Sequence, residues 1–206
     1  MTAEVMPPVA KKVPHRTNHH GVELVDDYAW MRAGNWQEAM RDPATLPDEI
    51  RAHLEAENAY VAAVMADTEE LQRELFEEMK GRIKEDDSSV PSPDGPWAYY
   101  TRYVTGGQYP LLCRQPRDGG DEIVLLDGTR EGEGQPYWQL GGASHSPDHK
   151  LLAYAVDGNG SEYYTIKVRD LGAGRDLDDE ITQAGGSVIW CRDSASLYYL
   201  RLDDNH

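Results

Sequence analysis

A nucleophilic serine in an α/β hydrolase stands in a Gly-x-Ser-x-Gly turn between a strand and a helix. The nearest stretch of this sequence is Gly142-Ala143-Ser144-His145-Ser146, in which serine replaces the last glycine. No strand–turn–helix pattern surrounds it, so we interpret it as a turn of a β domain. The sequence also lacks a Cys-x-x-Cys pair, a His-Glu-x-x-His motif, a phosphate loop and a dinucleotide fingerprint. We therefore predict no catalytic residue, no cofactor-binding residue and no cofactor.

Histidines at short spacing are the next candidates, because imidazole is a common metal ligand. One group is His15, His19 and His20, and the other is His145 with His149. The first group lies in a Pro-rich stretch, and the second lies in an expected turn, where i,i+4 spacing does not bring side chains together. We interpret all five as surface or packing residues.

Oxygen ligands for Ca²⁺ could come from the acidic run Glu85-Asp86-Asp87. The run lacks the spaced Asp or Asn positions and the central glycine of a calcium loop, so a solvated junction is the preferred interpretation. Paired carboxylates could also hydrolyse glycosides, but adjacency in sequence does not establish the separation that this reaction needs. We predict no metal site in the chain.

Composition narrows the classes of protein further. The 206 residues carry 37 acidic and 20 basic side chains, a net charge of −17, which argues against a nucleic-acid partner. No apolar run approaches the ~20 residues that span a bilayer, and the first residues lack the apolar core of a signal peptide. The two cysteines, Cys113 and Cys191, are expected to be free thiols. These features together predict a cytoplasmic protein with no membrane partner.

The first part of the chain is expected to be irregular and then helical. Residues 1–45 contain repeated prolines and predict only one helical turn, around 26–31. Apolar residues at helical spacing predict two amphipathic helices across 48–84. Asp48 is a candidate N-cap for the first helix, and Asp67 with Glu70 resembles a capping box that starts the second. The second helix carries an apolar stripe of Leu71, Leu75, Met79 and Ile83.

After Pro91 the pattern changes to short apolar alternations between glycine-rich turns, which predicts an antiparallel all-β half rather than a parallel sheet. Thr105-Gly106-Gly107 and Asp157-Gly158-Asn159-Gly160 are expected hairpin turns. The expected strands are 99–104, 111–114, 123–126, 151–156, 163–168, 188–190 and 197–202.

A weak repeat runs through this half. Ser92-Pro93-Asp94-Gly95, Ser146-Pro147-Asp148-His149 and Arg192-Asp193-Ser194 each precede a strand, and their aspartates lie 54 and then 45 residues apart. This period suits the blades of a β-propeller, at ~40–45 residues each. The 120 residues from 87 to 206 allow two to three blades, whereas propellers close with 4–8. We therefore predict an α+β chain: a helical arm over 1–85, then an incomplete propeller over 86–206.

Several short motifs spread along the whole chain are specific in combination. The most specific stretch is the junction from Glu78 to Pro91, EMKGRIKEDDSSVP. The others are His20-Gly21, Asp27-Tyr28-Ala29-Trp30, Glu57-Asn58-Ala59-Tyr60, Tyr100-Thr101-Arg102, Gly107 through Tyr109-Pro110, Ser146-Pro147-Asp148, Leu152-Ala153-Tyr154 and Trp190 with Asp193-Ser194. Together they resemble a known family, the prolyl oligopeptidases, and within it the oligopeptidase B branch. Two departures from the family pattern are Met31-Arg32-Ala33-Gly34, in place of a Trp-Leu-x-Asp continuation, and His149, where glycine is usual.

The resemblance implies a serine peptidase of short peptides, cleaving after Arg or Lys, in which a seven-bladed propeller caps an α/β-hydrolase domain. It implies that the N-terminal arm packs on that hydrolase domain, which is missing here together with the Ser-Asp-His triad. This chain alone is then expected to be inactive and to help gate substrate access. The alternative is a stand-alone interaction module that adds strands from a partner to its open sheet edge.

Overall fold

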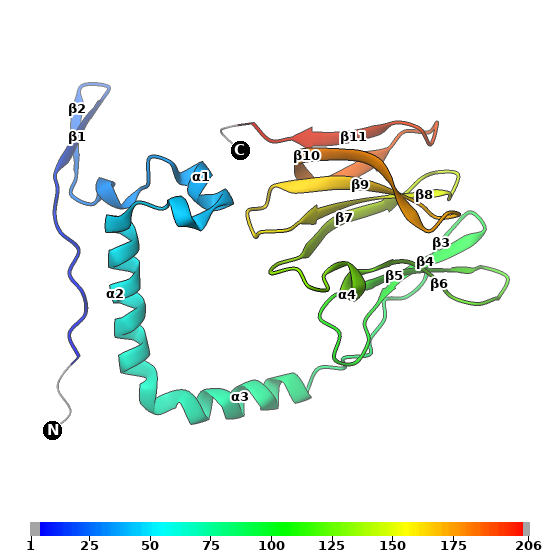
Figure 1. Ribbon diagram of the computed structural model, residues 1–206, viewed down its shortest axis with the longest axis horizontal. Helices are drawn as coiled ribbons and strands as arrows, with labels where there is room; N and C mark the ends of the chain where they lie inside the picture. Colours follow the sequence, from blue (N-terminus) through cyan, green and yellow to red (C-terminus); the bar gives the residue numbers. More distant parts are fainter. Residues whose placement is uncertain (1–4, 204–206) are drawn as a thin grey trace. The chain divides into compact units, whose positions relative to one another are not determined.

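The computed structural model describes residues 5–203 and divides the chain into two compact units, Met1–Ile83 and Lys84–His206. The first unit is mainly helical, and the second consists of two antiparallel sheets (Figure 1). The mixed fold class and the antiparallel strand order agree with the sequence-based prediction. No helix of the described residues has the length and apolarity needed to cross a bilayer.

The first unit opens with a hairpin that the sequence analysis did not expect. Strands β1 (His15–His19) and β2 (Val22–Asp26) pair antiparallel, so the prediction of irregular chain over 1–45 is wrong here. His20 and Gly21 connect them with φ of 54° and 86°, as a two-residue turn of type I′ requires. Both strands are mostly exposed, and β1, HRTNH, contains no apolar residue, so its hydropathy carries no strand signal.

Short helical pieces follow the hairpin: η1 (Ala29–Met31), α1 (Trp36–Arg41) and η2 (Pro43–Thr45). The first lies within the expected helical turn, but α1 was not expected. Asp42 ends α1 and begins η2, where its carboxylate accepts a hydrogen bond from the Ala44 amide.

Two helices then confirm the amphipathic pattern: α2 (Asp48–Met65) and, after the turn η3 (Ala66–Thr68), α3 (Glu69–Gly81). Both expected caps are one residue off, because Pro47 and Thr68 hold the N-cap positions and neither makes a side-chain cap. Asp48 lies inside the first turn of α2, where a carboxylate stabilises the positive end of the helix dipole. The apolar stripe of α3 is exposed: Leu71 54%, Leu75 46%, Met79 60% and Ile83 65%.

The second unit begins with a four-stranded sheet in the order β3-β4-β5-β6, which we call the first sheet. Its hairpin after β4 turns at Gly106 and Gly107, as the sequence predicted. A short helix, α4 (Gly128–Glu131), follows the last strand and is capped by Asp127. The strands are β3 (Ser92–Asp94), β4 (Trp97–Arg102), β5 (Leu111–Pro116) and β6 (Ile123–Asp127).

The second sheet has five strands in the order β11-β10-β9-β8-β7. In the 16-residue β10, the pairing with β9 runs from Arg175 to Ala184 and the pairing with β11 from Ala184 to Trp190. Its second half also approaches β7, so the sheet curls. The strands are β7 (Gln139–His145), β8 (Leu151–Asp157), β9 (Tyr164–Asp170), β10 (Arg175–Trp190) and β11 (Leu197–Arg201).

Seven strands lie where the alternation predicted them, but β3, β7 and the first half of β10 were missed. β7 contains Gly141 and Gly142, which carry no hydropathy signal, and β10 begins with the charged run RDLDDE. Tertiary pairing rather than residue type forms these strands.

Two apolar cores hold the second unit together. The first lies within the curled second sheet around Ala153, Ala155, Ile166 and Ala184, all at most 1% exposed. The second joins Leu125 and Leu126 of β6 to Leu152 and Tyr154 of β8. Since β6 and β8 belong to different sheets, this core packs the two sheets against each other and fixes the turns at their ends.

Candidate functional site

The three copies of the sequence repeat form equivalent turns between the first and second strand of a blade. Gly95, His149 and Ser194 occupy the same position with φ of 54°, 61° and 58°. The left-handed region favours glycine, yet histidine and serine adopt it here. The turn containing His149 therefore forms as expected despite its departure from the glycine that is usual at this position.

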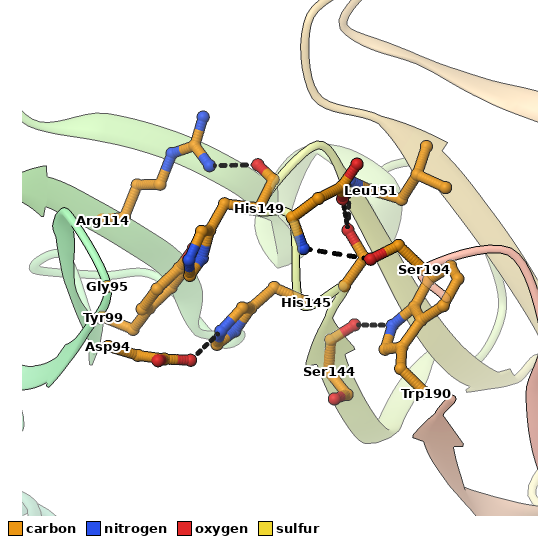
Figure 2. A network of polar contacts seen from close by, with 12 residues as sticks. Asp94, Gly95, Tyr99, Arg114, Ser144, His145, His149, Leu151, Trp190 and Ser194 are labelled. Carbon is orange, nitrogen blue, oxygen red and sulfur yellow. Dashed lines mark hydrogen bonds and ion pairs between the residues drawn. The ribbon is translucent and has the colours of Figure 1, made fainter. Parts of the chain in front are cut away.

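The three turns are Asp94–Gly95, Asp148–His149 and Asp193–Ser194. Hydrogen bonds near them join neighbouring blades. Nη1 of Arg114, on β5, donates to the His149 carbonyl oxygen at 2.7 Å. The Asp148 amide donates to Oγ of Ser194 at 3.1 Å. Figure 2 shows both contacts, which connect the first sheet to the His149 turn and that turn to the next one.

An aromatic stack lies beside the first two turns. The rings of Tyr99 and His145 are 3.8 Å apart between centroids and nearly parallel, at 5°. The Tyr99 hydroxyl is 2.8 Å from Nδ1 of His149, and Nε2 of His145 is 2.8 Å from Oδ2 of Asp94. The cluster therefore spans both sheets (Figure 2).

The expectation that His145 and His149 remain apart is wrong, because their rings stack with centroids 5.3 Å apart. His145 is the last residue of β7 rather than a turn residue, and the chain reverses at Ser146 to His149. A reversal of this kind returns residue i+4 to the neighbourhood of residue i. Because Gly95 has no side chain, the His149 ring fits beside it: a Cβ at position 95 would lie 2.5 Å from Nε2 of that ring.

Charges around the cluster favour an ionised Asp94. The hydrogen bond from His145 lowers the pKa of the Asp94 carboxyl, and the proximity of both imidazoles acts in the same direction. Burial raises the pKa of Tyr99, which keeps its hydroxyl protonated and able to donate or accept. Arg114, 8% exposed, stacks on Trp97 with its guanidinium carbon 4.0 Å from the ring centroid.

Among the described residues 5–203, Asp94, His145 and His149 are the group whose side-chain donor atoms come close enough to share a metal ion, all within 4.8 Å of one another. The three N-terminal histidines, His15, His19 and His20, instead lie exposed along the β1–β2 hairpin.

Two residues of the acidic run Glu85-Asp86-Asp87, at the start of the second unit, make local contacts. Glu85 accepts a hydrogen bond from the Gly106 amide at 2.9 Å, and Asp87 lies 3.6 Å from the ammonium of Lys84. The Glu85 contact holds the start of the second unit against the turn after β4, whereas the Asp87 contact is local to the junction.

The serines of the Gly142–Ser146 stretch have structural partners. The stretch is mostly strand β7, so its interpretation as a turn is wrong up to His145. Ser144 accepts a hydrogen bond from Nε1 of Trp190 through its carbonyl oxygen. Buried Ser146 donates its hydroxyl to Asp148 at 2.6 Å and accepts from the Leu151 amide. The Ser146 contacts brace the turn between β7 and β8, and the Ser144 contact joins β7 to β10.

A groove of about 990 Å³ lies between the two sheets, with His145 among the residues that line it. Its walls are rich in amphipathic rings, which combine apolar area with a polar tip. No local sequence pattern marks this groove, because its lining residues come from scattered strands and loops. The aromatic lining residues are Tyr99, Tyr100, Tyr103, Tyr109, Tyr137 and Trp138.

Two ion-pair clusters, also missed from the sequence, stabilise the sheets. Glu122 accepts hydrogen bonds from Arg102 and from the Tyr100 hydroxyl, and the Arg102 contacts lower its pKa to about 2. In the second sheet, Arg169 bonds Asp176 at 2.7 Å and Glu131 at 2.9 Å.

Comparison with known proteins gives a consistent match. A family model described as "Prolyl oligopeptidase, N-terminal beta-propeller domain" matches residues 7–206. Dipeptidyl aminopeptidase BI of Pseudoxanthomonas mexicana is 38% identical, over 98% of this chain and 29% of that protein. Protease 2 of Moraxella lacunata is 30% identical, over 96% of this chain and 28% of that protein.

Solved structures of the same family are also similar to this chain. Oligopeptidase B from Leishmania major superposes with a TM-score of 0.83 at 30% identity, covering 97% of this chain and 29% of that one. Oligopeptidase B from Trypanosoma brucei, with covalently bound antipain, gives 0.79 at 29% identity over 96% of this chain and 29% of that one. The chain thus spans about three tenths of the length of these relatives. It belongs to the prolyl oligopeptidase family, and residues 7–206 correspond to that family's N-terminal β-propeller domain.

Proposed function

We propose that the chain is the N-terminal part of a serine oligopeptidase similar to oligopeptidase B, which hydrolyses short peptides after Arg or Lys. The observation that carries the proposal is the likeness to oligopeptidase B along 97% of the chain, at a TM-score of 0.83. In this proposal the blades help to limit which peptides reach the site of hydrolysis.

The chain itself supplies no catalytic residue in this proposal. Serine attack needs a histidine base, a group that orients that histidine, and an oxyanion hole. In the described part of the chain, the imidazoles of His145 and His149 contact a carboxylate and a phenol, and the Ser146 hydroxyl donates to Asp148. The catalytic serine, aspartate and histidine would then come from a hydrolase domain outside these 206 residues.

The exposed apolar stripe of α3 supports the same proposal. Its four members, Leu71, Leu75, Met79 and Ile83, are each between 46% and 65% exposed. Covering such a stripe is favourable at ~25 cal/mol per Å² of apolar area. In this proposal the helical arm packs the stripe on the hydrolase domain.

Charge supports the proposed substrate class. The chain carries a net charge of −17, and an acidic surface raises the local concentration of cationic peptides. The preference for Arg or Lys would then have a long-range electrostatic component that weakens as salt increases.

A second candidate function is the release of dipeptides from the amino terminus of a peptide. It rests on the 38% identity to dipeptidyl aminopeptidase BI, higher than the identities to the oligopeptidase B structures. The two activities differ in whether the substrate needs a free amino group.

The test uses a longer polypeptide that contains this chain, and the 206-residue chain alone. Each is assayed on a fluorogenic Arg-Arg amide with a blocked amino terminus and on the same amide with a free one. We expect the longer polypeptide to cleave both and the chain to cleave neither. Cleavage of the free substrate only would favour dipeptide release, and turnover by the isolated chain would refute the assignment of catalysis to residues outside it.

A further inference from the structure

We propose that Asp94, His145 and His149 form a binding site for a divalent metal ion of the zinc class, which joins the first and second sheets. Their donor atoms lie within 4.8 Å of one another. The inference concerns these residues alone and does not depend on the proposed peptidase function.

The donor set suits such an ion. Two imidazole nitrogens and one carboxylate oxygen are ligands that Zn²⁺ accepts, with bonds of about 2.0–2.2 Å. Ca²⁺ and Mg²⁺ prefer sites made of oxygen. Three protein ligands leave a fourth position for water or another ligand. Nε2 of His145 and Oδ2 of Asp94 are 2.8 Å apart. Metal binding would replace the hydrogen bond between them, with the Nε2 proton released or moved to Nδ1 of the same ring.

The His149 ring is oriented for Nε2 ligation. Its Nδ1 is 2.8 Å from the Tyr99 hydroxyl. In the tautomer with the proton on Nδ1, the phenol oxygen accepts a hydrogen bond from Nδ1–H and the lone pair of Nε2 is free. An outer partner of this kind fixes the tautomer in many metal sites. Nε2 faces the Asp94–Gly95 turn, because a Cβ on Gly95 would lie 2.5 Å from it.

The backbone around the three ligands is held firmly. His149 adopts a φ of 61°, and its carbonyl oxygen accepts from Arg114, which is 8% exposed. His145 ends strand β7 and stacks on Tyr99. Asp94 ends strand β3 in the other sheet, so one ion would cross-link two blades.

The test titrates Zn²⁺ into the chelator-treated full chain by calorimetry, with Ca²⁺ as a comparison ion. We expect one equivalent of Zn²⁺ to bind and Ca²⁺ to bind at least ~10-fold more weakly. The ligand variants are Asp94→Asn and His149→Gly; glycine at 149 retains the left-handed backbone. Each should weaken binding by more than the roughly 10–100-fold that loss of an outer partner costs.

Two further variants test the outer partner of His149 and a histidine elsewhere in the chain. Tyr99→Phe keeps the ring but removes the hydroxyl, so Zn²⁺ affinity should fall by roughly 10–100-fold. His19→Gln alters an exposed histidine of the β1–β2 hairpin and should leave affinity unchanged. Circular dichroism confirms that each variant is folded. Absence of one-to-one binding, or equal affinity in folded Asp94→Asn and His149→Gly, would overturn the proposal and leave the cluster as a hydrogen-bonded contact between sheets.

Discussion

Gly95 and His149 are fitted to each other across the two sheets: a Cβ on Gly95 would lie 2.5 Å from Nε2 of the His149 ring. Both residues also lie in the left-handed region, with φ of 54° and 61°. The absent side chain at one turn therefore makes the space that the aromatic side chain of the next turn occupies.

The change Gly95→Ala should lower the free energy of unfolding by about 1–3 kcal/mol, because it adds backbone strain and a steric clash. In a His149→Gly background the clash disappears and only the strain remains. Urea denaturation of the four proteins of this double-mutant cycle measures the coupling. Equal losses in both backgrounds would show that the ring does not restrict residue 95.

Gly142 makes a close contact with a backbone atom, between β7 and β10. A Cβ there would lie 2.6 Å from the carbonyl oxygen of Gly186, and a backbone atom cannot rotate away. Gly142→Ala should therefore cost about 1–3 kcal/mol of unfolding free energy. The matched control is Gly158→Ala, which has no atom within 4 Å of the new Cβ. A similar melting temperature for both variants would contradict the curled packing of the second sheet.

Glu122 should make stability depend on pH. Hydrogen bonds from Arg102 lower its pKa to about 2, below the value of about 4.3 in an unfolded chain. A lowered folded-state pKa means that the contribution is complete above about pH 5 and is lost as the pH falls toward 2. With both side chains near 30% exposed, we expect about 1–2 kcal/mol after solvent screening.

The measurement compares urea midpoints of the protein and Glu122→Gln at pH 7, 4 and 3. The difference between them should shrink as the pH falls, whereas Glu133→Gln, at an exposed carboxylate, should show little difference at any pH. A Glu122→Gln difference that stays constant from pH 7 to 3 would exclude a strong Arg102–Glu122 pair.

Cys113 should be almost unreactive in the folded protein. The side chain is 1% exposed, and burial raises the pKa of its thiol to about 11. At pH 8 only about one molecule in a thousand would carry the reactive thiolate. Iodoacetamide labelling followed by mass spectrometry should modify partly exposed Cys191 first and Cys113 only after denaturation. Labelling of Cys113 in the native protein at the denatured rate would contradict its burial.

Local pattern was sufficient to predict much of the fold. The apolar spacing gave α2 and α3, and the alternation gave β4, β5, β8 and most other strands. The strands it missed depend on pairing with distant segments. In the β1–β2 hairpin, β1 is polar and the apolar residues of β2 are exposed. Strand β7 contains adjacent glycines that allow close approach to β10.

The candidate site was harder to predict because its parts are close only in space. Asp94 and His145 are 51 residues apart and meet because β6 and β8 pack their sheets together. The repeated Ser-Pro-Asp signal indicated equivalent turns, and a histidine in place of glycine at 149 marked this turn as unusual. Neither signal fixes which way a side chain points.

Labelling with a fluorophosphonate, which modifies activated serines, tests whether the catalytic serine lies outside these 206 residues. A longer polypeptide that contains them is labelled, digested and mapped by mass spectrometry, beside the chain alone. We expect the modified serine to lie outside the 206 residues and the chain alone to stay unlabelled. A label on Ser144, Ser146 or another serine of this chain would contradict it.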